Sequence, residues 1–163
     1  MRNAHIVLDA DVVIDYCSTD IGILRLARSV AAGINVVSTT LAEIPSLDEN
    51  ACSYNGIAVV EPTLEELLLA VGRRGRLSTP DHLCLLVAKR RGWTCVANDN
   101  APRGECVKEG VPTMWGLEIM VELVESGLLS PSRAIGIAEQ IIRNNLYITG
   151  EIVQRFRKRL VGR

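Results

Sequence analysis

Residues 5–16, HIVLDADVVIDY, decide the fold that we expect for this chain. The segment His5–Leu8 is short and mostly apolar, which predicts a buried β-strand, and Asp9 follows it directly. From Asp11 to Ala32 the pattern predicts one helix that ends at Gly33. A short apolar strand followed by a helix is the repeating unit of a parallel sheet that helices cover on both faces.

The same alternation of strand and helix continues along the chain. Further strands are predicted at 34–38, 57–60, 94–97 and 111–113, and helices at 39–44, 64–71, 78–91, 106–109, 117–124, 132–144 and 149–161, with a loop at 47–56. We therefore predict an α/β protein, a three-layer α/β/α sandwich with a central parallel sheet of four or five short strands. Residues 1–163 are expected to form a single domain, with a core of about 1–127 and a helical C-terminal extension of about 128–163.

The composition narrows the class of protein. The chain of 163 residues has a formal net charge of −1, so any binding of nucleic acid must come from local basic patches. The N-terminal stretch MRNAHIVLDAD is interrupted by charge, which predicts neither a signal peptide nor a membrane span. The five cysteines are scattered without a C-x-x-C pair, which argues against a zinc site and fits a reducing cytoplasm. Cys84 and Cys95 lie in apolar segments and are predicted core residues.

Four acidic residues are predicted to lie at one edge of the sheet. Asp9 and Asp99 follow predicted strands, Glu43 comes just after the second strand, and Asp81 is in the first turn of a helix that begins at Ser78. The carboxyl ends of parallel strands share one edge, and ligands bind in the crevice beyond it. The sequence therefore predicts a carboxylate site at this edge.

Such a site needs a counter-charge. Two carboxylates about 4 Å apart repel by roughly 1 kcal/mol in water and about 4 kcal/mol at an effective dielectric constant of 20. A divalent cation offsets that repulsion, and ligands that are all oxygen select a hard ion such as Mg²⁺ or Mn²⁺. The predicted chemistry is hydrolysis of a phosphodiester bond.

Each acid also has an ordinary structural interpretation. Asp81 fits the third position of a capping box, Asp99 in Asn-Asp-Asn fits a turn, and Glu43 fits an exposed helical charge. Asp9 is the hardest to explain in this way, because a strand end that faces a core rarely carries an unpaired acid.

The four acids lie in stretches that resemble the motifs of the PIN-domain nucleases, a family that includes VapC-type toxins and enzymes of ribosomal RNA processing. IVLDADVVIDY resembles the first motif, VVSTTLAEI the second, LSTPDHLCLLVAKRRG the third, and CVANDNAPRGECVKEGVPTMWGLEIMVELVESGLL the fourth with its following helix. The resemblance covers essentially the whole chain. It implies an endoribonuclease that depends on Mg²⁺ or Mn²⁺, either alone or as the toxin of a toxin–antitoxin pair. On the matching positions, it implies catalytic and metal-binding roles for Asp9, Glu43, Asp81 and Asp99.

Three details go beyond the four motifs. The tail GLLSPSRAIGIAEQIIRNNLYITGEIVQRFRKRL resembles a prokaryotic PIN subgroup with extra C-terminal helices. The family usually has Thr or Ser two residues before its last acid, and here that position is Ala97, which lacks the hydroxyl that would orient a ligand or water. Asp11 stands where Ser or Asn is commoner, and we expect it to cap the first helix rather than to add a fifth carboxylate.

Basic residues are the candidates for contact with RNA phosphates. Clusters occur at 73–76 and 89–91, and the expected RNA contacts are Arg103, Arg155, Arg157, Lys158 and Arg159. The alternative is that these are solvated charges near helix ends, which we prefer for 89–91. Trp93 and Trp115 are predicted core residues, so base stacking is not expected to dominate recognition. Trp115 opens an apolar helix at which a second copy of the chain, in a homodimer, or an antitoxin is expected to bind.

Two other functions fit parts of the sequence. Residues 9–13, DADVV, match the D-x-D-x-[T/V] motif of haloacid-dehalogenase-like phosphatases, in which the first Asp is a nucleophile. That family also needs a lysine and a later acidic pair, for which residues 98–100, NDN, are a poor match. The other alternative is a degenerate nuclease fold that binds RNA or protein without activity, which Ala97 favours.

Overall fold

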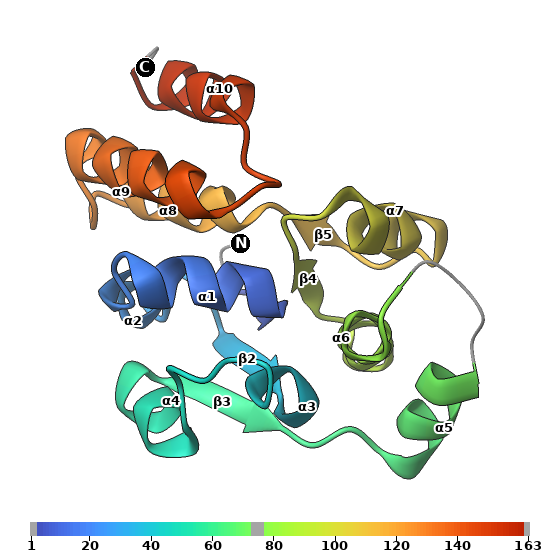
Figure 1. Ribbon diagram of the computed structural model, residues 1–163. Coiled ribbons are helices and arrows are strands. Elements are labelled where there is room, and N and C mark those ends of the chain that lie inside the picture. Colours follow the sequence, from blue (N-terminus) through green and yellow to red (C-terminus); the bar gives the residue numbers. More distant parts are fainter. Residues whose placement is uncertain (1–2, 73–76, 162–163) are drawn as a thin grey trace.

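The computed structural model describes residues 3–72 and 77–161, and its centre is one parallel sheet. The strand order is β3-β2-β1-β4-β5, and all four neighbouring pairs are parallel (Figure 1). The strands are β1 His5–Leu8, β2 Gly33–Val37, β3 Ile57–Val60, β4 Thr94–Val96 and β5 Thr113–Met114. The predicted parallel sheet is therefore confirmed.

Helices cover both faces of this sheet, as predicted for a three-layer α/β/α sandwich (Figure 1). The helices are α1 Ala10–Ser18, α2 Gly22–Ala27, α3 Ser38–Leu41, α4 Glu49–Asn55, α5 Leu64–Gly72, α6 Thr79–Arg91, α7 Asn100–Lys108, α8 Gly116–Glu125, α9 Pro131–Asn144 and α10 Gly150–Val161. Within residues 3–72 and 77–161, none of them is long and apolar enough to cross a membrane.

The alternation of side chains along β1 explains the two layers. Ile6 and Leu8 belong to a core that α1, α2, α4, α8, α9 and α10 complete, whereas Val7 belongs to a second core with α5, α6 and α7. Successive residues of a strand point to opposite faces, so both faces of this apolar strand are buried. The C-terminal helices α9 and α10 thus pack as part of the first layer (Figure 1).

Local signals fixed the bounds of α6 as the sequence predicts. Ser78 is the N-cap, Pro80 lies in the first turn, and the Ser78 and Asp81 side chains form a capping box. Gly92 ends the helix with a φ of 66°, a conformation that favours glycine because it has no Cβ.

The predicted single helix from Asp11 to Ala32 is wrong, because the chain breaks between α1 and α2. The Ser18 and Thr19 hydroxyls donate to the backbone oxygen of Asp15 at 3.1 and 2.6 Å, where α1 ends. Asp20 then accepts the Gly22 N–H at 3.0 Å. Side chains that bond to nearby backbone compete with continued helix, and three such residues in a row end it.

Other bounds also differ from the sequence prediction, among them the predicted helix 39–44, which ends at Leu41 as α3. The expected loop 47–56 contains α4, which Asp48 caps and Gly56 ends at a φ of 69°. The helix α7 begins at Asn100 rather than near residue 106, because Asp99 caps it. The fifth strand starts at Thr113, which pairs with Cys95, and so comes later than 111–113.

Candidate active site

The strand order puts Asp9 at the point where the topology of the sheet reverses. The chain runs from β1 outward through β2 to β3, and then returns to form β4 on the other side of β1. Ligands of open parallel sheets bind beyond the carboxyl ends of the strands at such a point. Asp9 directly follows β1, and Asp99 is the third residue after β4.

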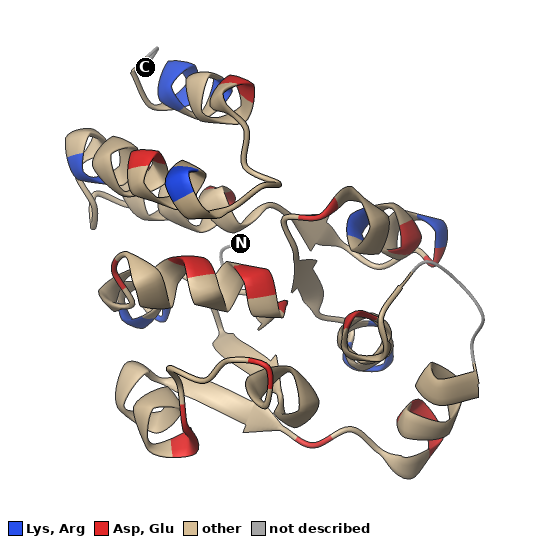
Figure 2. Ribbon diagram, in the orientation of Figure 1, with Lys and Arg blue, Asp and Glu red and all other residues tan. Residues whose placement is uncertain are grey.

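The other two acids lie at the same edge. Glu43 is an exposed residue in the turn after α3, which follows β2 directly. Asp81 is in the first turn of α6, the helix that leads back to the amino end of β4 and therefore begins at the carboxyl edge. Figure 2 shows acidic residues at the N-terminal end of α1 and at the turn into α7.

The acids are close enough to change one another's pKa. Asp9 is only 5 % exposed, and burial raises its pKa from the usual 3.8 to about 7, with the charge of Asp81 as the next cause. Asp11 and Glu43 raise the pKa of Asp9 further. Burial also raises the pKa of Glu43, followed by the charges of Asp81 and Asp11. The edge of the sheet therefore concentrates negative charge that nothing in the described chain neutralises in full.

Three of the acids also make local hydrogen bonds. Asp9 Oδ1 accepts the Ala10 N–H at 2.9 Å, Asp81 Oδ2 accepts the Ser78 N–H at 3.1 Å, and Asp99 Oδ1 accepts the Ala101 N–H at 3.1 Å. Asp81 is therefore a capping-box acid and Asp99 a turn residue, as their ordinary structural interpretations predicted. These roles do not prevent either residue from binding a cation. Each of these bonds uses one carboxylate oxygen, and the second oxygen is still suited to bind a cation.

The expectation that Asp11 caps the first helix is wrong. Asp9 is the N-cap of α1, and Asp11 lies in its first turn, where it is half-buried. Burial raises the pKa of Asp11, and the charges of Asp81 and Asp99 raise it further. This arrangement favours the alternative that Asp11 is a fifth carboxylate beside the other four.

No group of three His, Cys, Asp or Glu side chains in the described part of the chain already has the arrangement of a metal site. The carboxylates are gathered but still turned toward their own helix ends. Binding of a cation therefore requires side-chain rotation at this edge. At Ala97, the position where the resembling family carries a hydroxyl, the side chain is fully buried and its N–H donates to the Met114 carbonyl at 3.2 Å.

Sequence reasoning missed a buried polar cluster next to these acids. Asp15 is 5 % exposed, and its Oδ2 accepts the side-chain amides of Asn98 at 2.8 Å and Asn145 at 2.7 Å. Burial is the main cause that raises the pKa of Asp15 to about 7, and both amides oppose it. Asp15 follows Asp11 by one helical turn, which was the one available signal in the sequence.

Tyr147 was also missed. It lies between α9 and α10 in sequence, and its phenol pKa is raised by the charge of Asp99 first and then by that of Asp11. Asp81 and Asp9 contribute in the same direction. A residue of the C-terminal extension is therefore within electrostatic range of the candidate site, and no motif indicated it.

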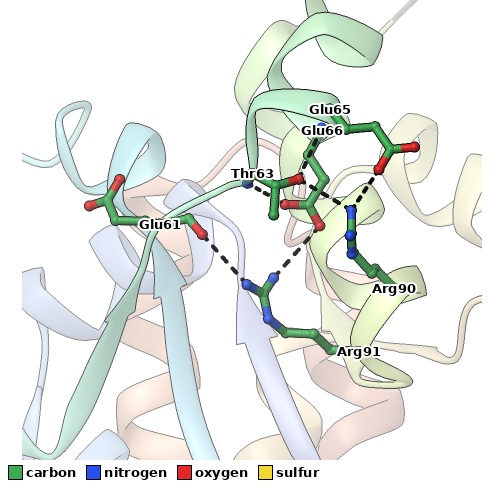
Figure 3. A network of polar contacts seen from close by, with 6 residues as sticks. All are labelled: Glu61, Thr63, Glu65, Glu66, Arg90 and Arg91. Carbon is green, nitrogen blue, oxygen red and sulfur yellow. Dashed lines mark hydrogen bonds and ion pairs between the residues drawn. The ribbon is translucent and has the colours of Figure 1, made fainter.

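The predicted basic cluster at 89–91 is bound to neighbouring acids. Arg90 pairs with Glu65 at 2.9 Å and Arg91 contacts Glu66 at 3.8 Å, while Lys89 pairs with Glu109 at 2.7 Å. Figure 3 shows the arginines joined to the segment that carries Glu61 and Thr63 and begins α5. We expected solvated charges near a helix end, and the structure instead pairs all three basic residues with acids. The predicted cluster at 73–76 lies outside the described residues.

The basic face of α10 is exposed, as predicted, but it is largely paired. Arg155 pairs with Glu151 at 2.5 Å, Arg157 with Glu139, and Arg159 with Glu118 at 3.4 Å. Exposed ion pairs contribute little to stability, so a phosphate can replace the acid partners at modest cost. The three arginines are therefore available to RNA only by exchange, whereas Lys158 is exposed and has no ion pair within residues 3–72 and 77–161.

The prediction that both tryptophans lie in the core is wrong, whereas the RNA contact predicted for Arg103 stays a prediction. Trp93 and Trp115 are half-buried at the margins of the cores instead of inside them. The Arg103 guanidinium carbon lies 3.7 Å from the centre of the Trp115 ring, and burial lowers the pKa of Arg103. Arg103 is thus engaged in packing against α8.

Comparison with known proteins supports the architecture. No protein-family model and no curated protein sequence matches the chain. A solved structure, a PilT N-terminus (PIN) domain protein of the hyperthermophilic archaeon Sulfolobus solfataricus P2, matches 72 % of this chain and 91 % of its own with a TM-score of 0.55. The two sequences are 13 % identical, so the match shows the fold alone.

The fold is PIN-like, with a five-stranded parallel sheet between two layers of helices. The narrower resemblance to VapC-type toxins finds no support in the comparison.

Proposed function

We propose that this protein is an endoribonuclease that depends on Mg²⁺ or Mn²⁺. The observation that carries the proposal is the state of Asp9, a carboxyl group 5 % exposed at the topological switch point of a PIN-like sheet. The charges of Asp81, Asp11 and Glu43 raise its pKa, and that of Asp99 raises the pKa of Asp11. Burial of an acid among like charges is costly, and groups with such perturbed pKa values are concentrated at functional sites.

The donor set fits a hard divalent cation. The proposed ligands Asp9, Glu43, Asp81 and Asp99 offer carboxylate oxygens only, which suits Mg²⁺ and Mn²⁺ better than softer ions. The pKa of Asp9 is raised mainly by burial and further by the charges of Asp81, Asp11 and Glu43, and a bound cation would offset both effects. When bound, the ion neutralises charge on the scissile phosphate and makes water a stronger nucleophile.

The residues of the chain supply orientation and access. The Ala10 N–H binds one oxygen of Asp9, which leaves the other oxygen to bind a cation at the carboxyl edge of the sheet. Glu43 is exposed and lies at the rim, where it is accessible both to water and to substrate.

We also propose that the protein acts in a toxin–antitoxin pair, is located in the cytoplasm and forms a homodimer. Most apolar side chains of α8 are buried in the chain, but Trp115, Leu117 and Val121 line a hollow together with α10. Binding of a partner at this helix therefore stays part of the proposal.

The test is cleavage of single-stranded RNA by the wild-type protein with Mn²⁺ or Mg²⁺. We expect cleavage that a chelator abolishes and that Asp99→Asn lowers by at least about a hundredfold. Asp48→Asn is the matched control, because Asp48 is also an N-cap aspartate but caps α4. Its charge is not among those that raise the pKa of Asp9, Asp11 or Glu43. That variant should cleave like the wild type.

Other outcomes would support the alternative functions. Hydrolysis of a phosphate monoester with a trapped aspartyl-phosphate at Asp9 would indicate a haloacid-dehalogenase-like phosphatase. Binding of RNA without any cleavage in either metal would indicate a degenerate module, for which the buried Ala97 is the favouring observation.

A further inference from the structure

A buried hydrogen-bonded junction ties the C-terminal extension to the candidate site. Asp15 of α1 accepts amide hydrogens from Asn98 and Asn145, and these three side chains belong to residues 5 %, 2 % and 9 % exposed. Asn98 also accepts the Gly116 N–H at 3.0 Å. Asn98 directly precedes Asp99, and Asn145 directly follows α9, so the end of α9 is held next to the turn into α7 (Figure 1).

The segment after Asn145 is fixed at both ends. The Tyr147 N–H donates to Asn145 Oδ1 at 2.8 Å, and Ile148 is buried with 1 % exposure. Between these anchors Leu146 is 95 % exposed and Tyr147 is 46 % exposed. Two apolar side chains are therefore presented to solvent by a segment that the junction holds in place. Binding residues are commonly carried by loops that a rigid scaffold positions in this way.

The charges around Tyr147 determine which chemical groups its ring is suited to bind. The hydrogen bonds through Asn98, Asp15 and Asn145 place Tyr147 near the turn that carries Asp99. The charges of Asp99 and Asp11 raise the pKa of the Tyr147 phenol, so the ring stays neutral. A neutral ring gives no charge attraction to phosphate. It does offer a flat apolar face, and proteins bind unpaired nucleotides by stacking their bases on such faces.

We infer that Tyr147 is a substrate-contact residue, whose ring stacks on a base of single-stranded RNA next to the phosphodiester bond held at the acids. This inference rests on the proposed function and names Tyr147 as a residue that selects single-stranded RNA as its substrate. Single-stranded RNA is favoured over a duplex because only an unpaired base is free to leave its neighbours and stack on the protein.

The test measures binding rather than activity. A short, fluorescently labelled single-stranded RNA is titrated with each variant in Ca²⁺ buffer and followed by anisotropy. Tyr147→Ala should weaken binding about tenfold, whereas Tyr147→Phe, which keeps the ring, should stay within about twofold of the wild type. Tyr54→Ala is the control, because Tyr54 is 75 % exposed on α4, which leads into the amino end of β3. It should bind RNA like the wild type.

A second readout reports the stacking itself. Tyr147→Trp should show a fluorescence decrease on addition of RNA, beyond any change in the wild type, and Tyr54→Trp should not. Wild-type binding and cleavage with an unaffected Tyr147→Ala would overturn the inference and leave the proposed function intact. Equal losses in Tyr147→Ala and Tyr147→Phe would overturn stacking. A wild-type protein that neither binds nor cleaves RNA would overturn both.

Discussion

Asp9→Asn is expected to raise the melting temperature of the metal-free protein by about 4–8 °C at pH 8. The same substitution should lower RNA cleavage with Mn²⁺ by at least about a hundredfold. Asparagine keeps the size of the side chain and is as good an N-cap as aspartate, so the Ala10 hydrogen bond of α1 survives. What it removes is a buried negative charge among Asp81, Asp11 and Glu43.

The direction of the effect follows from the pKa. Asp9 has a pKa of about 7 in the folded chain against a usual 3.8, so the folded state binds this proton more tightly than the unfolded state does. The stability that the proton provides is present below about pH 4 and is lost as the pH rises through about 7. The complete difference corresponds to about 4 kcal/mol, and we expect asparagine to recover about half of it because its amide is also buried.

The measurement is thermal unfolding followed from pH 4 to pH 8 in the presence of a chelator. The wild type should lose stability across this range, and Asp9→Asn should lose less, with the remaining fall due in part to Asp15. Asp48→Asn should stay within about 2 °C of the wild type, because exposed substitutions change stability little. A lower melting point for Asp9→Asn at pH 8 would show that the acids do not repel one another as described.

Asn98→Ala should lower the free energy of unfolding by about 3 kcal/mol. The Asn98 side chain donates to Asp15 and accepts from the Gly116 backbone, and it is 2 % exposed. Its removal leaves a buried N–H without an acceptor and takes one donor from a buried carboxylate. Both losses are costly because water does not reach these buried groups. The turn that carries Asp99 also loses the hydrogen bonds of Asn98 that hold it in place.

Asn100→Ala provides the comparison within the same Asn-Asp-Asn turn. Asn100 is exposed at the first position of α7, so its substitution should change the free energy of unfolding by less than about 0.5 kcal/mol. Denaturation with urea gives both values. Equal effects of the two substitutions would contradict the assignment of Asn98 to a buried junction.

The sequence by itself determined the strands, the bounds of α6 and the edge at which the acids lie. Short apolar runs such as His5–Leu8 are stable only when buried on both faces, and the Ser78 cap and Gly92 terminus act within a few residues. These are local interactions. For the same reason, the order of strand, acid and helix was sufficient to predict that Asp9 and Asp99 share one edge.

Tertiary structure alone decided the contacts between distant segments. Asp15 meets Asn98 across 83 positions and Asn145 across 130, and no local pattern records such pairs. No local pattern records the ion pairs of Arg157 and Arg159 on α10 either, or the effect of the carboxylates on Tyr147. The physical reason is that burial and charge pairing depend on which surfaces pack together, and that is settled only when the whole chain is folded.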